Sequence, residues 1–403
     1  MAAPSPLGCA PFRWLLTGRV VNSLGNSVAP IALAFAVIDL TRSASDLGIV
    51  VGARSVANVL LLLFGGVLAD RLPRGLVLVG SCVAAAVTQG CVAALILTGQ
   101  AQIWSLAALG FVNGAVAALS FPASAALTPS TVPAELFQRA SAITRIGLNL
   151  TNVLAISLGG VLVATVGPGW GIAVDAGSFA LAGLAFTRVH VDHVAKQDET
   201  TMLADLREGW SEFISRTWVW VVVLQFCVVN AALSGAEGVL GPVVADRTIG
   251  RGLYGVELAA STLGLIIGAV FALKMTTRRP LLLGVAAMLL SVLPALGLGI
   301  APNLAVLVPC FLIAALGTDV FGVAWDTSLA QNVPADKLAR VYSYDALGSL
   351  VAIPVGEVAV GPVAQIIGVR STLIGCATAI LGATLLALAS RSVRNLERSE
   401  VPR

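Results

Sequence analysis

Long apolar runs recur along this chain of 403 residues and limit what it can fold into. A helix needs about 20 largely apolar residues to cross a bilayer, and the sequence contains twelve runs of that kind. Charged residues make up only 11% of the chain, against about 25% in soluble globular domains. We therefore expect an all-α membrane protein with twelve transmembrane helices. The predicted helices cover, to within about 2–4 residues, 14–38, 47–68, 75–98, 103–127, 144–166, 169–187, 217–243, 255–275, 280–299, 304–324, 345–366 and 371–390.

One polar stretch separates the first six runs from the last six. It extends from Arg188 to Arg216 and holds ten charged residues. We expect an N-terminal six-helix half at 1–188, a cytoplasmic linker at 189–216 and a C-terminal six-helix half at 217–403. Apolar residues recur at helical spacing within the linker, which predicts an amphipathic helix on the membrane surface. These residues are Leu203, Leu206, Trp210, Phe213 and Ile214.

Lys and Arg residues collect on one side of the predicted helices. If the N-terminus lies inside the cell, the inside segments hold 18 of these residues and the outside loops hold 4. Cytoplasmic loops of membrane proteins are rich in Lys and Arg, so both termini are predicted to be cytoplasmic. The first run lacks a persuasive small-residue cleavage site, and we interpret it as a retained helix and not as a signal peptide.

The sequence also contains an internal repeat. VPAELFQRASAITRIG at 132–147 matches VPADKLARVYSYDALG at 333–348, an offset of 201 residues. Both copies fall in the connection between the fourth and fifth runs of their half. Internal duplication explains this agreement better than chance does, and two halves related by a parallel repeat are typical of transporters.

A tight charge cluster lies between the second and third runs, in GVLADRLPR. Gly66 allows a neighbouring helix to approach closely, Pro73 helps to end the second helix, and Arg74 is a cytoplasmic anchor. The cluster matches the G-x-x-x-D-R-x-x-R signature of the major facilitator superfamily through Gly66, Asp70, Arg71 and Arg74. Other stretches resemble the enterobactin-exporter-like and macrolide-type drug efflux branch of that superfamily. They are TGRVVNSLGNSVAPIALAFAVIDLT, GPGWGIAVDAGSF and VPADKLARVYSYDALGS.

The resemblance implies an inside gate. Asp70 and Arg71 would close it against the eleventh helix, which we expect to begin near Tyr344 and Asp345. The alternative is that these charges only set the topology. The corresponding loop of the second half, GAVFALKMTTRRP at 268–280, has no acid, so the gate is expected to be asymmetric.

The resemblance also implies a function. The chain would be a secondary active transporter, not an enzyme, that exports small amphiphilic compounds such as antibiotics by proton-driven alternating access and so contributes to antibiotic resistance. The alternatives are a siderophore or secondary-metabolite exporter and a metabolite importer of the same fold. The expected partners are the lipid bilayer, a small-molecule substrate and protons, without nucleic acid. We expect a monomer in the bacterial plasma membrane.

Ionisable residues inside the apolar runs are functional candidates, because a charge in the bilayer core is costly. Arg19 shares one helical face with Asn22 and Asn26. This polar face either lines a central cavity or holds helices together.

The second run carries another buried charge, Arg54, which could pair with Asp39 or with Asp175. A structural salt bridge and a coupling role are both open. Desolvation suits a buried acid to taking up and releasing protons. Three further acids compete as the proton-coupling site, namely Glu357, Asp319 and Glu237.

Two departures from drug antiporters weaken the case for proton antiport by the usual residues. The fourth run has no charge, and Asn113 is its only strongly polar residue near the middle. In the fifth run, AISLGG stands where such antiporters carry G-P-x-x-G-G. The sequence has no G-x-x-x-x-G-K-[ST] phosphate loop and no H-E-x-x-H motif, which disfavours an ATP-driven pump and a membrane metalloenzyme. No cofactor or metal site is expected.

Overall fold

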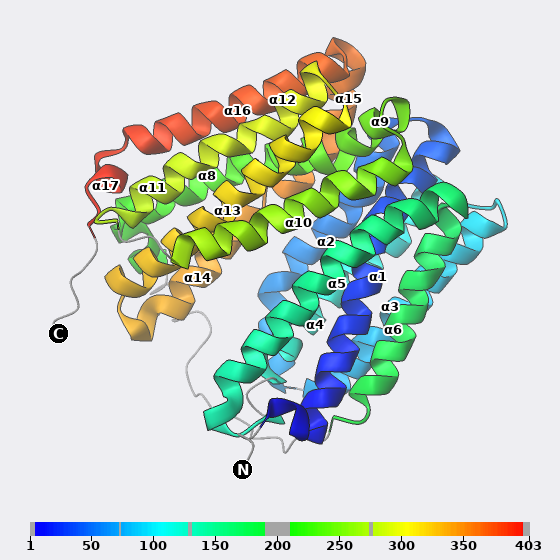
Figure 1. The fold of residues 1–403 in the computed structure, drawn as a ribbon, viewed down its shortest axis with the longest axis horizontal. Helices are drawn as coiled ribbons and strands as arrows, with labels where there is room; N and C mark the ends of the chain where they lie inside the picture. The colour runs from blue at the N-terminus through cyan, green and yellow to red at the C-terminus, as the bar shows by residue number, and fades with distance from the viewer. Residues whose placement is uncertain (1–4, 72–73, 128–130, 190–209, 274–276, 398–403) are drawn as a thin grey trace. The chain divides into compact units, whose positions relative to one another are not determined.

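The computed structural model describes residues 5–71, 74–127, 131–189, 210–273 and 277–397. All regular secondary structure in these ranges is helical (Figure 1). Twelve helices there are long and apolar enough to cross a membrane. The prediction of an all-α protein with twelve membrane-spanning helices is therefore confirmed.

Single continuous helices make up the first six spans. Within this group α6 packs against α1 and α3, and α2 packs against α4 (Figure 1). The short helices η1 (Pro6–Gly8) and η3 (Ala134–Leu136) precede the first and fifth spans. The six spans are α1 (Ala10–Thr41), α2 (Ala44–Arg71), α3 (Arg74–Leu97), α4 (Ile103–Leu127), α5 (Phe137–Thr165) and α6 (Pro168–Phe186).

Three of the last six spans are divided into shorter helical segments. The seventh contains a π-helical segment, the ninth contains a 3₁₀ turn, and the eleventh is interrupted between α14 and α15. The segments are α8 (Thr217–Leu233), η4 (Ser234–Leu240), α9 (Gly241–Arg247), α10 (Arg251–Leu273), α11 (Pro280–Ala287), η5 (Met288–Ser291), α12 (Val292–Ile300), α13 (Leu304–Asn332), α14 (Ala335–Leu350), α15 (Ile353–Ile367), α16 (Val369–Ala389) and α17 (Arg391–Arg394).

The interruption of the eleventh span follows from its sequence. Pro354 has no backbone N–H, so the helical hydrogen bond to the carbonyl of residue 350 cannot form. The neighbouring α8 and η4 each supply a donor at this point. Asn230 Nδ2 donates to the carbonyl of Ser349 at 2.8 Å, and Ser234 Oγ donates to the carbonyl of Ile353 at 3.4 Å. These bonds satisfy backbone groups that have no water to bind in a bilayer.

A close helix crossing accompanies this interruption. A Cβ atom at Gly356 would lie 1.9 Å from the carbonyl oxygen of Ala231 on α8. Only glycine therefore allows α15 to pass α8 at this distance.

The helices pack into two compact units. The first comprises Met1–Gln197 and Gly250–Ala259, and the second comprises Asp198–Ile249 and Ala260–Arg403. Each unit contains its own buried apolar cluster. The cluster in the first includes Leu15, Leu78, Phe179 and Phe186. The cluster in the second includes Trp218, Met288, Phe321 and Trp325.

The end of the linker is helical over residues 210–215 and packs on α14. The Trp210 ring stacks on Phe213 at a centroid distance of 5.7 Å and contacts Tyr344 at 5.4 Å. This agrees with the predicted helix for the part that is described. Leu203 and Leu206 lie outside the described residues.

Ion pairs hold the same segment in place. The half-buried Glu212 carboxylate pairs with Arg216 in the next turn and with Lys337 at the start of α14. Hydrogen bonds from Arg216 and Lys337 lower the pKa of Glu212 from 4.5 to about 2. The folded state therefore gains stability from ionised Glu212 above pH 4.5 and loses it progressively as the pH falls towards 2.

We predict that Glu212→Gln loosens the end of the linker at pH 7. Ion pairs of this kind contribute about 0.5–1.4 kcal/mol, so hydrogen exchange of the amides in residues 210–216 should accelerate about 2- to 10-fold. In the unmodified chain, protection corrected for intrinsic exchange should be constant from pH 8 to 5 and fall below pH 4.5.

Glu397→Gln is the matched control, because Glu397 pairs with Arg279 where both side chains are largely exposed, at 64% and 46%. Exchange in 210–216 should not change in this variant. Equal exchange in the Glu212→Gln and unmodified chains would contradict the account.

Candidate functional site

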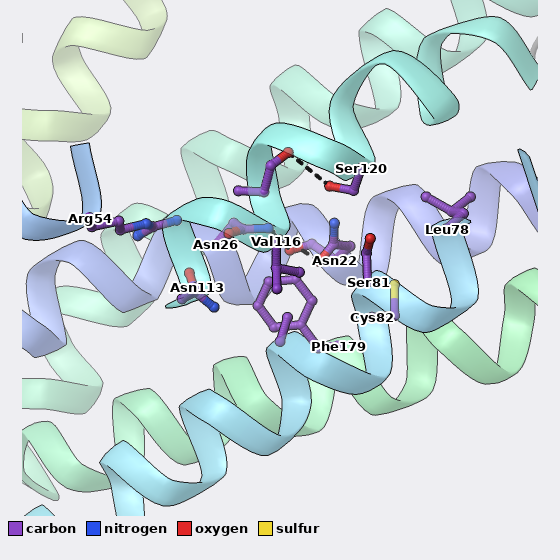
Figure 2. A pocket seen from close by; sticks show the side chains of 12 residues that line it. Asn22, Asn26, Arg54, Leu78, Ser81, Cys82, Asn113, Val116, Ser120 and Phe179 are labelled. Atoms are coloured by element: carbon purple, nitrogen blue, oxygen red, sulfur yellow. Dashed lines mark hydrogen bonds between the residues drawn. The ribbon is translucent and has the colours of Figure 1, made fainter. Parts of the chain in front are cut away.

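A polar pocket lies among the helices of the first unit (Figure 2). Its walls come from α1, α2, α3, α4 and α6, and its volume is about 70 Å³. The lining residues are Asn22, Asn26, Arg54, Leu78, Ser81, Cys82, Ala85, Asn113, Val116, Ala117, Ser120 and Phe179.

The size of the pocket limits what it can hold. Sites for drug-sized ligands span about 300–1,000 Å³, so this pocket is too small to enclose one. A cavity needs a volume of only about 10–15 Å³, together with polar partners, to hold one water molecule. The pocket thus suits a few water molecules or a small ion.

Two of the residues predicted on the face of α1 line this pocket. Asn26 Nδ2 donates to both the carbonyl and the side-chain oxygen of Asn22, each at 3.2 Å. Arg19 is half-buried and is not among the lining residues. Whether this face also borders a larger cavity stays a prediction.

The fourth helix contributes Asn113, which is only 4% exposed. Its Nδ2 donates to Thr88 Oγ1 on α3 at 3.4 Å. In Figure 2, Asn113 lies on the side of the pocket nearer Arg54, while Ser81 and Ser120 lie on the other. An uncharged α4 therefore still supplies polar surface to the pocket.

Asp175 on α6 is completely buried, with 0% exposure. Its Oδ2 accepts a hydrogen bond from Gln89 Nε2 on α3 at 2.6 Å. The charge of Arg54 also acts on this carboxylate. Within the described part of the chain, Oδ1 accepts no hydrogen bond.

Of the two acids considered as partners of Arg54, Asp175 lies where the guanidinium charge acts on it, and the pairing itself stays a prediction. Asp39 instead forms a bidentate ion pair with Arg251, whose Nη1 lies 2.8 Å from Asp39 Oδ2. Gln89 had not been identified from the sequence. It could have been, because it is the only amide side chain in the third apolar run.

The crossing of α1 and α6 confines the Asp175 carboxyl group. A Cβ atom at Gly25 would lie 1.9 Å from Ser178 Oγ and 2.6 Å from Asp175 Oδ1. Ser178 Oγ donates to the backbone carbonyl of Asp175 at 2.8 Å. The absence of a side chain at Gly25 is thus what leaves room for the carboxyl group.

The other candidate acids lie in the second unit. Glu357 on α15 is 6% exposed and directly follows Gly356, at the crossing with α8. Glu237 is half-buried in the π-helical segment η4, a type of distortion that is frequent at functional sites. Since α15 packs on η4, the structure places these two acids on adjoining elements. Asp319 lies apart from them on α13, where it faces Gly268 of α10.

One buried acid was not identified from the sequence. Glu257 on α10 is 0% exposed. Its position within the eighth apolar run was the signal that could have identified it.

The gate residues can be placed only by their backbone. Gly66, Asp70 and Arg71 lie in the last turns of α2, and Arg74 is the first residue of α3. Their side chains are outside the described residues, as is the loop at 72–73. The gate therefore stays a prediction.

The expected start of the eleventh helix was wrong. The helix begins at Ala335, not near Tyr344 and Asp345. Its first turns carry charged residues that end the apolar run without ending the helix. Asp345 is instead internal to α14 and accepts hydrogen bonds from Trp325 Nε1 at 2.8 Å and from Ser349 Oγ at 3.1 Å.

Comparison with known proteins identifies the family. The model of the Major Facilitator Superfamily matches residues 15–356. The enterobactin exporter EntS of Escherichia coli O139:H28 is 28% identical over 339 residues, covering 82% of this chain and 79% of the exporter. EntS of Escherichia fergusonii matches equally well.

Solved structures show the same fold. The nucleoside transporter NupG superposes with a TM-score of 0.74 at 12% identity, covering 94% of this chain and 98% of that one. An inward-facing, occupied bacterial homologue of the human lysosomal transporter Spinster gives 0.76 at 15% identity, covering 99% and 100%. A bacterial homologue of the iron transporter ferroportin gives 0.71 at 17% identity, covering 94% and 99%.

We predict that Gly25→Ala destabilises the first unit. The added methyl group would overlap Ser178 and Asp175, and overpacking of this kind costs about 1–3 kcal/mol. The melting temperature of the purified protein in detergent should fall by several degrees.

Gly177→Ala on α6 is the matched control, because a Cβ atom there meets nothing within 4 Å. In an open helical position this change is expected to stabilise by about 0.4–1 kcal/mol. If Gly25→Ala melted at or above the temperature of Gly177→Ala, the tight α1–α6 crossing would be disproved.

Proposed function

Since the chain belongs to the major facilitator superfamily, and is thus a secondary transporter and not an enzyme, we propose that it exports small amphiphilic compounds. The observation that carries the direction of transport is the similarity to EntS, an enterobactin exporter, over 82% of this chain. This relationship makes a siderophore the first substrate to test, with antibiotics as the second.

We propose the proton gradient as the energy source. The support is the set of acids within membrane spans, because such groups are costly and mark proton relays in many transporters. Asp175 and Glu357 are 0% and 6% exposed, and Glu237 and Asp319 are half-buried. The described residues include no group of three or more His, Cys, Asp or Glu side chains placed to hold a metal ion.

The substrate would bind outside the pocket of the first unit, because 70 Å³ is too small for a siderophore or an antibiotic. Transport would proceed by alternating access between an N-terminal and a C-terminal half, with Asp70 and Arg71 acting at the inside gate. The excess of Lys and Arg in alternate loops supports cytoplasmic termini. We propose a monomer in a bacterial plasma membrane as the working unit.

We predict that expression of the chain in an Escherichia coli strain without its enterobactin exporter lowers the cellular content of labelled enterobactin. A protonophore should restore the content to that of the empty strain, because it removes the driving force. A second set of cultures with a labelled macrolide tests antibiotic export. Confirmed membrane expression with unchanged content of both compounds would contradict the proposal.

Variants at the two ends of α2 extend the test. Asp70→Asn should reduce export at least about tenfold, as expected if a gate interaction of about 1.4 kcal/mol is lost. Asp46→Asn, the same change in the first turn of α2, should leave export unchanged. Equal export by the two variants would remove Asp70 from the mechanism.

A further inference from the structure

Asp175 is the buried ionisable group whose surroundings the structure defines best. Three elements enclose the carboxyl group: α3 donates one hydrogen bond through Gln89, α2 contributes the charge of Arg54, and α1 crosses at Gly25. Its Oδ1 accepts no hydrogen bond from the described residues. Asp175 is thus a buried acid in an apolar helix bundle, and one of its two carboxyl oxygens has no hydrogen bond from the described residues.

This arrangement is poor as a purely structural salt bridge. A buried carboxylate is stable only when its charge is paired and its lone pairs are satisfied. Gln89 and Arg54 meet only part of that requirement, and the unsatisfied oxygen carries an uncompensated desolvation penalty. An oxygen of this kind is instead suited to receive a proton.

The pocket is the candidate source of that proton, because α1, α2, α3 and α6 contribute both to its walls and to the surroundings of Asp175. Arg54 both lines the pocket and acts on Asp175. A volume of 70 Å³ accommodates several water molecules. Asn22, Asn26 and Ser81 line the same space and can bind those waters (Figure 2).

We propose that Asp175 is a proton-binding site supplied by water in this pocket, and that Arg54 responds to its charge. A hydronium in the pocket gives its proton to Oδ1, which becomes an O–H group, and leaves as water. The pair of side chains changes from net zero to +1. The Asp175 carboxyl group then no longer offsets the positive charge of Arg54, which lines the pocket.

Among the described residues, few charged groups surround Asp175. Arg54 on α2 is the ionisable group that acts on it among the described residues. Its other neighbours are uncharged. The Asp175 carboxyl group accepts a hydrogen bond from Gln89 of α3 and lies against Gly25 of α1. The hydroxyl group of Ser178, on the same helix, donates to the backbone carbonyl of Asp175. In the described part of α5, which also packs on α6, no ionisable group acts on this carboxyl. The state of the site is thus controlled by one proton and one guanidinium.

This assignment rests on the proposed function in one respect: it makes Asp175 the group through which a proton gradient drives export. The binding of the proton can be tested without any substrate. Infrared spectra of the full chain in lipid nanodiscs should show the C=O stretching band of a neutral carboxylic acid that grows as the pH is lowered. Asp175→Asn should remove that band, and Asp46→Asn should retain it.

Arg54→Gln is a second, independent variant in case Asp175→Asn does not fold. Removing the positive charge makes the carboxylate less favourable, so the neutral-acid band should be larger than in the unmodified chain at the same pH. An unchanged band in both variants would overturn the proposal.

Transport in proteoliposomes then tests coupling, with labelled enterobactin as the probe. Asp175→Asn should retain exchange of enterobactin across the membrane but lose at least about 90% of the uptake driven by a pH gradient, a tenfold effect. Full gradient-driven transport by this variant would overturn the coupling role. If the unmodified chain does not move enterobactin, the proposed function fails, and the infrared titration still decides whether Asp175 binds a proton.

Discussion

The lack of water in the bilayer core is the constraint on which the rest of this structure depends. Backbone polar groups there must be satisfied within the protein, which is why the described spans are helices. The interruption between α14 and α15 obeys the same rule, because Asn230 of α8 and Ser234 of η4 donate to carbonyls on either side of it. Departures from regular helix thus occur where a neighbouring helix can supply the missing partner.

The same lack of water makes each charge inside a membrane span costly. An ionised side chain persists in the membrane only where partners or enclosed water offset its desolvation. Asp175 has Gln89 and the charge of Arg54, and α6, which carries Asp175, also contributes to the wall of the polar pocket. Under the proposal made above, the pocket's volume of about 70 Å³ keeps proton binding separate from the binding of a larger substrate.

Sequence alone predicted most of the fold, because the free energy of inserting a helix sums over about 20 residues and tolerates single errors. The predicted start of the eleventh helix was wrong, because hydropathy detects only the apolar part of a helix. The helix begins at Ala335, with charged turns that precede the apolar run. The sequence left both Asp39 and Asp175 as partners for Arg54; the structure shows Arg251 on Asp39, and the pairing of Arg54 with Asp175 stays a prediction. Gln89 and Glu257 were missed because each lies within a long run whose residues are mostly apolar.

The central claim is that protons and substrate move in opposite directions through one protein. The most direct measurement uses the purified chain in liposomes that contain a pH-sensitive dye, with a pH gradient imposed across the membrane. The account predicts that adding enterobactin accelerates the decay of the gradient, in proportion to the enterobactin transported, and that no acceleration occurs in liposomes without protein. Transport of enterobactin with no accompanying change in proton flux would contradict it.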